Sequence, residues 1–189
     1  TYLQAGVKLD NNAAPMDGQR SIQITPLMQA TIVDALKGLF QQSSAIASQY
    51  RRGQMGTAIG FDWFMDQNCN THTVGPLGGT PLTNGVPTSG ATTLVTDGWS
   101  ASAAARLKEG DLFTLPAVNA VNPQSRQSTG QLQQFVVTAD VSSDGSGNLT
   151  AAISPAITSS GAFQTVDALP ADNSALTIVG TASQQSPQG

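Results

Sequence analysis

Two alternating segments separated by a short turn constrain the fold of this chain more than any other feature. Apolar side chains recur at every second position on both sides of the turn formers Asp144-Gly145-Ser146-Gly147-Asn148. The alternating positions are Phe135, Val137, Ala139 and Val141 before the turn, and Leu149, Ala151 and Ile153 after it. A period of two on either side of a glycine-rich turn predicts an antiparallel hairpin with one buried face.

Further short strands are predicted at regular spacing on both sides of this hairpin. The predicted strands span residues 92–96, 112–115, 132–141, 149–153 and 175–179. Helical periodicity is nearly absent here apart from a possible turn at residues 101–107, so the pattern predicts a small antiparallel barrel or sandwich. Residues 75–90 are expected to form a loop or a wide hairpin with Asn84-Gly85 as its turn. Residues 181–189 are expected to be a frayed end or a return connection.

The first third of the chain has a different pattern. Residues 1–20 contain turn signals and are expected to be irregular. Ile22 and Ile24 alternate in a predicted short strand, and Thr25-Pro26 favours a helix start, with Thr25 as N-cap. That helix would present one apolar stripe, made of Met28, Ile32, Leu36 and Leu39.

A second, shorter helix is predicted from Ser43 or Ser44 to Arg52. Arg51 and Arg52 in its last turn suit the helix dipole, and they could alternatively contact an acidic partner. The run FDWFM at residues 61–65 is predicted to be a strand with Trp63 buried in a core.

Charge and cysteine content exclude several classes of protein. Charged residues make up 11% of the chain and its net charge is −4, so a basic footprint for nucleic acid is absent. Apolar runs fall short of the roughly 20 residues that a membrane helix needs. The single cysteine, Cys69, rules out an internal disulfide and fits a reducing cytosol. The start lacks a signal peptide and an initiator Met, so a fragment or processed form is expected.

The sequence offers little to a catalytic or metal site. With one His and one Cys in the chain, a zinc site is close to excluded. His72 and Cys69 could belong to a nucleophilic triad, but neither an oxyanion hole nor an orienting acid is evident nearby, and a hydrogen-bonded boundary residue is the favoured interpretation of His72. Residues 140–145 resemble the start of a calcium loop, but Ala151 stands where a glutamate ligand is required. We therefore expect no enzyme, no cofactor and no metal.

Three ordered stretches nevertheless resemble a known family, the major capsid (coat) proteins of tailed phages of the P22 type. The stretches are residues 48–53 (SQYRRG) with 60–62 (GFD), residues 107–115 (LKEGDLFTL) with 117–118 (AV), and residues 161–166 (GAFQTV) with 169–172 (LPAD). Pro116 stands where the family commonly has Gly. The resemblance covers nearly the whole chain.

The resemblance implies the Hong Kong ninety-seven fold with a telokin-like insertion domain. The implied class is α+β: an A-domain portion of helices and short strands, followed by an antiparallel β-barrel or immunoglobulin-like insertion domain. The implied domain ranges are 1–72 for the A-domain portion, 73–180 for the β-rich insertion domain, and 181–189 for a return connection or frayed tail. The chain would then be an excised piece of a coat protein.

The same resemblance implies a structural role in the virion. Such subunits self-assemble into hexamers and pentamers in the host bacterial cytoplasm, guided by scaffolding protein, without specific nucleic acid or membrane partners. The insertion domain would stabilise the subunit, and a loop from it would reach a neighbouring capsomer. The candidate inter-capsomer residues in this sequence are Leu77, Leu82, Asn84, Gly85 and Val86. The family uses charged residues there, and this chain has none from Gly75 to Val95.

One rival interpretation remains at the level of sequence. A weakly charged β-rich chain with two tryptophans could be a carbohydrate- or surface-binding module of a phage virion protein. That function would require Trp63 and Trp99 to be exposed and coplanar with a groove, whereas we expect Trp63 to be buried.

Overall fold

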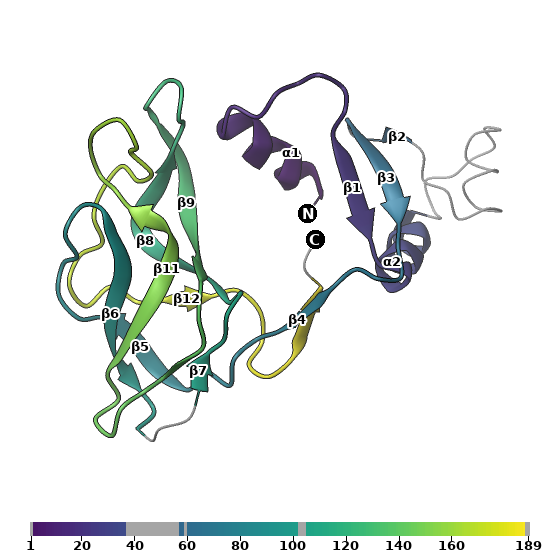
Figure 1. Ribbon diagram of the computed structural model, residues 1–189. Helices are drawn as coiled ribbons and strands as arrows, with labels where there is room; N and C mark the ends of the chain where they lie inside the picture. The colour runs from purple at the N-terminus through teal and green to yellow at the C-terminus, as the bar shows by residue number, and fades with distance from the viewer. Residues whose placement is uncertain (1, 37–56, 59, 102–104, 188–189) are drawn as a thin grey trace. The chain divides into compact units, whose positions relative to one another are not determined.

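The computed structural model describes residues 2–36, 57–58, 60–101 and 105–187, which fall into two compact units (Figure 1). One unit comprises residues 1–10, 14–71 and 187–189, and the other comprises residues 11–13 and 72–186. The helix predicted between Ser43 and Arg52 lies outside the described residues, as does Leu39.

The first unit opens with helix α1 (Tyr2–Asn11), where the sequence led us to expect irregular chain. The turn signal that begins at Asp10 ends this helix instead of preventing it. The Arg20 guanidinium holds the following loop: it binds Asp10 Oδ1 at 2.7 Å and the Ala14 carbonyl at 2.9 Å. No helix in the described residues is long and apolar enough to cross a membrane.

A small sheet and one helix form the core of this unit. The sheet has the order β1 (Ser21–Ile24), β3 (Phe61–Met65), β2 (Thr57–Ala58), with β1 parallel and β2 antiparallel to β3. Helix α2 (Pro26–Leu36) begins where predicted, and the Met28 amide donates to Thr25 Oγ1 at 3.3 Å. Ile24, Phe61 and Trp63 are buried together, as the prediction for Trp63 required, and Met28 and Ile32 pack against them.

The second unit is almost entirely antiparallel sheet. Its strands are β4 (Thr71–Thr73), β5 (Gly79–Thr83), β6 (Ala91–Trp99), β7 (Ala105–Leu107), β8 (Leu112–Val121), β9 (Ser128–Val137), β10 (Val141–Ser142), β11 (Leu149–Ile157), β12 (Thr177–Ile178) and β13 (Gln185–Pro187). Six of them form one sheet in the order β12-β8-β9-β11-β6-β5, while β10 pairs with β7 and β13 with β4.

Three predicted elements have different bounds in the structure. β8 continues past the predicted end because Ala117, with a φ of 60°, accommodates a register shift after Thr114. The long segment predicted over residues 132–141 is two strands, since β9 ends at Val137 and Ala139 is exposed. The predicted loop at residues 75–90 contains β5, so that only its second part is a loop.

The six-stranded sheet closes on itself into a barrel. Its edge strands β5 and β12 are joined by the segment around Ala175, which forms an antiparallel bridge with Leu82. The Thr83 amide donates to the Ser174 carbonyl at 2.9 Å, and the Val179 amide donates to the Leu112 carbonyl at 2.8 Å. The segment that contains β12 therefore bonds to β8 on one side and to β5 on the other, as a closed barrel requires.

Alternating side chains from these strands fill the barrel interior. The Phe113 and Phe135 rings stack at its centre, with their centroids 5.5 Å apart. The other buried core residues are Leu94, Trp99, Leu107, Leu115, Val118, Val137, Leu149, Ala151, Ile153, Ile157, Val166 and Leu176. The predicted inward faces of both hairpin segments are confirmed, except at Ala139 and at Val141, which is only partly buried.

The strand directions give the barrel two ends with different contents. The chain enters and leaves at the proximal end, through residues 72–78 and 180–186. The opposite end carries residues 84–90, 122–127 and 158–172, which we call the distal surface. The registers of β11 with β6 and of β8 with β9 bring these three segments to the same end.

Candidate interaction surface at the distal end

The structure separates the five predicted contact residues into two groups. Leu77 packs against the barrel core, and Leu82 lies half-buried in β5. Asn84, Gly85 and Val86 follow β5 in the exposed turn, and Val86 is 58% exposed. Only these three lie on the distal surface, where a partner could reach them.

The loop at residues 84–90 is held in place by its neighbours. The Gly85 amide donates to Asp172 Oδ1 at 2.7 Å, and the Gly90 amide donates to the Ile157 carbonyl at 2.7 Å. Gly85 has a φ of 82°, a conformation that glycine adopts without steric cost. The loop thus presents a defined surface tied to the barrel at both of its ends.

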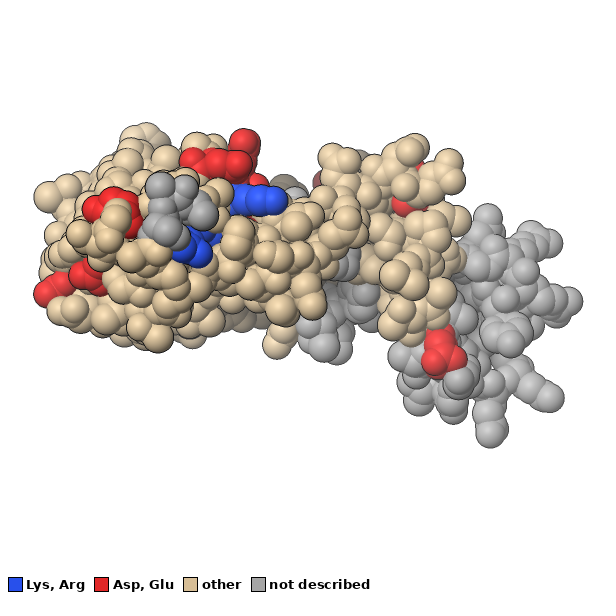
Figure 2. Space-filling model, turned by 90° about the horizontal axis from the view of Figure 1, so that it is seen from below, with Lys and Arg blue, Asp and Glu red and all other residues tan. Residues whose placement is uncertain are grey.

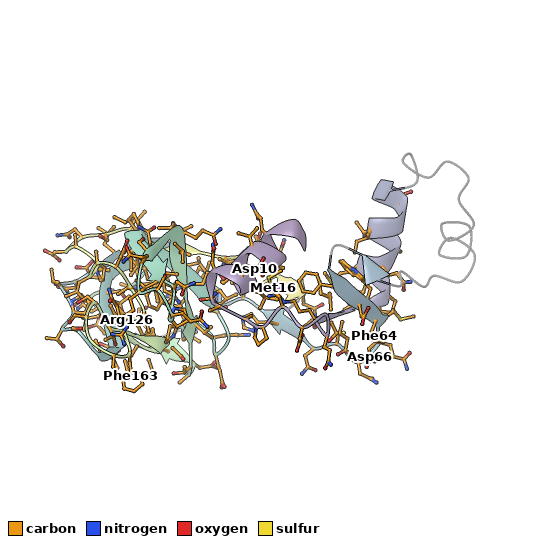
Figure 3. All side chains as sticks on the ribbon, turned by 90° about the horizontal axis from the view of Figure 1, so that it is seen from above. Asp10, Met16, Phe64, Asp66, Arg126 and Phe163 are labelled. Atoms are coloured by element: carbon orange, nitrogen blue, oxygen red, sulfur yellow. The ribbon has the colours of Figure 1, made fainter. Side chains whose placement is uncertain are left out.

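The other two segments of the distal surface are tied to this loop and to each other. The Ser159 amide donates to Ser89 Oγ at 3.1 Å. The Arg126 Nη1 group, from the hairpin between β8 and β9, donates to the Gly161 carbonyl at 2.7 Å. Figure 3 shows Arg126 and Phe163 near one another on the barrel. These bonds join three loops that are distant in sequence.

Phe163 is the residue of this surface that sequence reasoning missed as a contact. Its side chain is 87% exposed, more than any other large hydrophobic residue of the described chain. Burying a phenylalanine stabilises a protein by about 1.5–3 kcal/mol, so an exposed one is unused apolar area. The available signal was an aromatic residue inside a Gly-, Ser- and Gln-rich loop, outside every alternating pattern.

A small hollow adjoins Val86 on the same surface. Its volume is about 190 Å³. Its lining residues are Asn84, Gly85, Val86, Pro87, Thr88, Ala91, Thr93, Leu94 and Val95. None of these side chains carries a charge, so the hollow can receive an uncharged group without leaving an ion desolvated.

Charged groups on the distal surface are few, and each has a local partner. Burial raises the pKa of the Asp167 carboxyl, but hydrogen bonds from the Asn119 side chain, the Asn119 amide and Ser128 Oγ bring it below the ordinary value of 3.8. Asp172 accepts the Gly85 and Asn173 amides. Figure 2 views the molecule from below Figure 1, toward the proximal end of the barrel, and uncharged residues predominate on that face as well.

A second polar cluster lies at the proximal end and is centred on Asp111. The carboxylate is buried, and it accepts the Gly75 amide at 3.2 Å and the Lys108 amide at 2.8 Å. Its Oδ1 lies 2.7 Å from His72 Nε2. His72 is therefore a hydrogen-bonded residue at the entry to the barrel, and Asp111 is the acid that the sequence alone did not place beside it.

In the calcium-like turn, the Asp144 carboxylate is held by groups of the turn itself. Asp144 accepts the Ser146 and Asn148 amides and the Asn148 side chain, and these bonds, led by the Asn148 amide, lower the pKa of its carboxyl. The carboxylate is thus engaged by the turn itself. The described residues contain no group of three or more His, Cys, Asp or Glu side chains able to hold a metal ion.

Both tryptophans are buried, contrary to what the surface-binding alternative requires. Trp63 is 8% exposed and Trp99 is 4% exposed. Trp99 Nε1 donates to Thr96 Oγ1 at 2.9 Å inside the barrel. Neither ring is available as a stacking platform for a sugar.

Comparison with known proteins gives one family match. The family model described as P22 coat protein, gene protein 5, matches residues 15–187. Among solved structures the chain is similar to the CUS-3 coat protein I-domain, with 27% sequence identity and a TM-score of 0.37, over 56% of this chain and 98% of that one. A comparison with curated proteins gave no match.

Proposed function

The chain belongs to the P22 coat protein family, and on that premise we propose that it forms part of an icosahedral shell built from hexamers and pentamers. The observation that carries the proposal is the family match over residues 15–187, nearly the whole chain. Membership makes the protein a structural component of a phage capsid that assembles with copies of itself.

The geometry of the second unit supports a specific role for the barrel within the subunit. Its closed sheet and continuous core make it a stable body, and its polar proximal cluster secures the chain where it enters. We propose that this barrel is the insertion domain, that it stabilises the subunit, and that the loop tip at Asn84, Gly85 and Val86 contacts a neighbouring capsomer. We also propose that a scaffolding protein is the partner during assembly and that assembly takes place in the host cytoplasm.

The proposed contact is apolar. The loop carries no charge, so salt bridges cannot be its source of affinity. Val86 and Pro87 would lose water-exposed area instead, and burial of apolar area contributes about 25 cal/mol per Å². Shells held in this way should resist added salt, because screening weakens only charged contacts.

Assembly itself tests the proposal. Coat protein that carries this sequence, mixed with its scaffolding protein, should form closed shells visible by electron microscopy and pelleting as particles. Val86→Ser should weaken the shells against urea, while Val179→Ser, at a similarly exposed valine near the proximal end, should not. Dispersed protein under all assembly conditions would refute the capsid function, and equal behaviour of the two variants would refute the loop contact alone.

A further inference from the structure

The turn after β5 contains the only Asn-Gly pair of the sequence, Asn84-Gly85. An asparagine side chain can reach the backbone amide of the residue that follows it, and a following glycine hinders the approach least because it has no Cβ. Both residues are exposed, and a Cβ on Gly85 would meet nothing within 4 Å. The Gly85 nitrogen is therefore open to approach by the neighbouring carboxamide.

The fold does not hold the side chain of Asn84. Its backbone amide donates to the Val95 carbonyl at 2.9 Å, but its carboxamide makes no hydrogen bond within the described part of the chain. The carboxamides of Asn119, Asn148 and Asn173, in contrast, each donate to an aspartate. The Asn84 side chain can thus turn towards the Gly85 nitrogen, whereas these three side chains are restrained.

We propose that Asn84 is a site of spontaneous deamidation and that Asp172 restrains the reaction in the folded chain. The Gly85 nitrogen forms a bond to Asn84 Cγ, the Cγ–Nδ2 bond breaks, and the amide proton leaves with Nδ2 as ammonia. Water then opens the cyclic imide at either of its carbonyls, which leaves an aspartate or an isoaspartate at position 84. Both reacting groups lie on adjacent residues, and water is the only co-reactant.

The Asp172 carboxylate holds the nitrogen that must react. The Gly85 amide donates to Asp172 Oδ1 at 2.7 Å, and it has to lose this proton when it attacks. A carboxylate beside the nitrogen opposes the negative charge that develops on it, and the charge-assisted bond fixes the peptide within the loop. The reaction therefore requires a local opening in which the loop leaves Asp172.

The product changes the loop that contains it. Residues 75–95 carry no charge, and deamidation adds a carboxylate next to the bond between Gly85 and Asp172. Neighbouring carboxylates repel each other, so the bond that restrains the reaction is weakened once the reaction has occurred. The modification thus converts an anchored loop into a released one. This inference does not depend on the capsid function, because it needs only the folded barrel.

Site-resolved mass spectrometry of the aged protein tests the proposal. The full chain is incubated in mildly alkaline buffer, folded or unfolded in urea, and isoaspartate is labelled with an isoaspartyl methyltransferase. Conversion should be concentrated at Asn84 and should be faster in the unfolded chain, and Asn84→Gln should abolish the label there. An Asn84 that stays unconverted in the unfolded chain would refute the site. Equal rates in the folded and unfolded chain would refute the restraint.

Two substitutions of Asp172 show whether its carboxylate restrains the reaction or promotes it as a base. Asp172→Ala removes the acceptor and should speed conversion of Asn84 in the folded chain about tenfold or more, the factor expected from one lost charge-assisted hydrogen bond. Asp172→Asn keeps an acceptor oxygen without the charge and should react at an intermediate rate. Unchanged or slower conversion in these variants would overturn the role of Asp172.

Asp144→Ala is the matched control at another turn. It frees the Asn148 carboxamide, but Leu149 follows there and its side chain hinders the attack. Asn148 should remain unconverted, and Asn84 should keep its original rate. Rapid conversion of Asn148 would show that a released side chain suffices without glycine, against the assignment to the Asn-Gly pair. Circular dichroism checks that each variant is folded, and Asp172→Asn, which keeps the side-chain shape, decides if Asp172→Ala is not.

Discussion

At the scale of single residues, Asp111 is a buried side chain that depends on hydrogen bonds from its surroundings. Its carboxylate is 1% exposed, and the backbone amides of Gly75 and Lys108 donate to it, with His72 Nε2 at 2.7 Å. A buried charge is tolerated only when its hydrogen bonds are complete. Asp111 therefore connects the entering chain to the turn before β8 by means that no apolar residue could supply.

Asp111→Ala should lower the free energy of unfolding by about 3 kcal/mol, since it leaves several buried donors without an acceptor. Urea denaturation followed by tryptophan fluorescence measures this loss through Trp99. Glu109→Ala, at an exposed residue of the same turn, is the matched control and should change stability by less than about 0.5 kcal/mol. Equal losses in the two variants would show that the cluster is not structurally important.

Asp167 predicts an acid-sensitive component of stability. The pKa of its carboxyl is lowered in the folded chain, so its contribution is complete above the ordinary value of 3.8 and is lost as the pH falls through the lowered folded value. Asp167→Asn should therefore flatten the dependence of unfolding free energy on pH between about pH 5 and pH 2. Urea denaturation at a series of pH values measures the slope.

A second variant, Asn119→Ala, tests whether the hydrogen bonds to Asp167 cause the lowered pKa of its carboxyl. Asn119→Ala keeps the carboxyl but removes its side-chain donor, so the acid limb of the stability curve should move to higher pH. An acid limb that is identical in the wild type and both variants would contradict the assignment.

At the scale of elements, closure of the barrel depends on β5 and the segment that returns beside it. Thr83 Oγ1 is buried, donates to the Ala171 carbonyl at 2.7 Å and accepts the Ser174 amide at 2.8 Å. The hydroxyl therefore fastens the last segment of the barrel to its first strand.

Thr83→Val should cost about 0.5–1.5 kcal/mol, because the shape is kept while the Ala171 carbonyl and the Ser174 amide lose their hydrogen-bond partner. Hydrogen exchange should accelerate at the amides of Thr83 and Leu176, which bond across this seam. Thr92→Val, at an exposed position of β6, is the control and should leave both amides protected. Unchanged exchange at the seam in Thr83→Val would mean that closure does not depend on the hydroxyl.

Elements with one buried face were predictable from the sequence, and those governed by local backbone geometry were not. The period of two from Phe135 to Val137 and from Leu149 to Ile153 identified the interior strands because burial imposes that pattern. The pattern could not reveal that Ala117 adopts a positive φ and prolongs β8, or that Ala139 lies past the end of β9. Helix α1 was missed because its turn signals were taken as evidence against a helix.

The candidate site was predicted only in part. A glycine turn in an uncharged loop identified Asn84, Gly85 and Val86, and their exposure is a property of the turn itself. Leu77 and Leu82 were chosen as apolar residues near that turn. In the structure, Leu82 belongs to strand β5 and Leu77 packs against the barrel core. Phe163 could not be added from sequence, because its proximity to the loop depends on bonds between segments far apart in the chain.

At the scale of the whole molecule, the barrel has what an independently folding domain needs. It contains its own core, and its edges are joined to each other. A fragment of residues 72–186 should therefore unfold in one cooperative transition on heating, as measured by circular dichroism and calorimetry. A gradual, non-cooperative loss of signal would contradict the proposed domain ranges.

A shorter fragment makes that test specific. Residues 72–171 keep most of the core but lack the segment that bonds to β8 and β5, so the barrel cannot close. This fragment should lose its cooperative transition and bind a hydrophobic dye through its exposed interior. A cooperative melt from the shorter fragment would show that closure is dispensable.

The pairing of β4 with β13 has a consequence for how such chains evolve. Paired strands lie about 4.8 Å apart, so the positions where the chain enters the barrel (β4) and leaves it (β13) are nearly adjacent. A segment inserted between neighbouring points leaves the path of its host chain undisturbed, and its removal leaves a gap that a short turn can bridge. Recombination can then gain, discard or trade the entire barrel as one unit, so the barrel's sequence can change at a pace of its own.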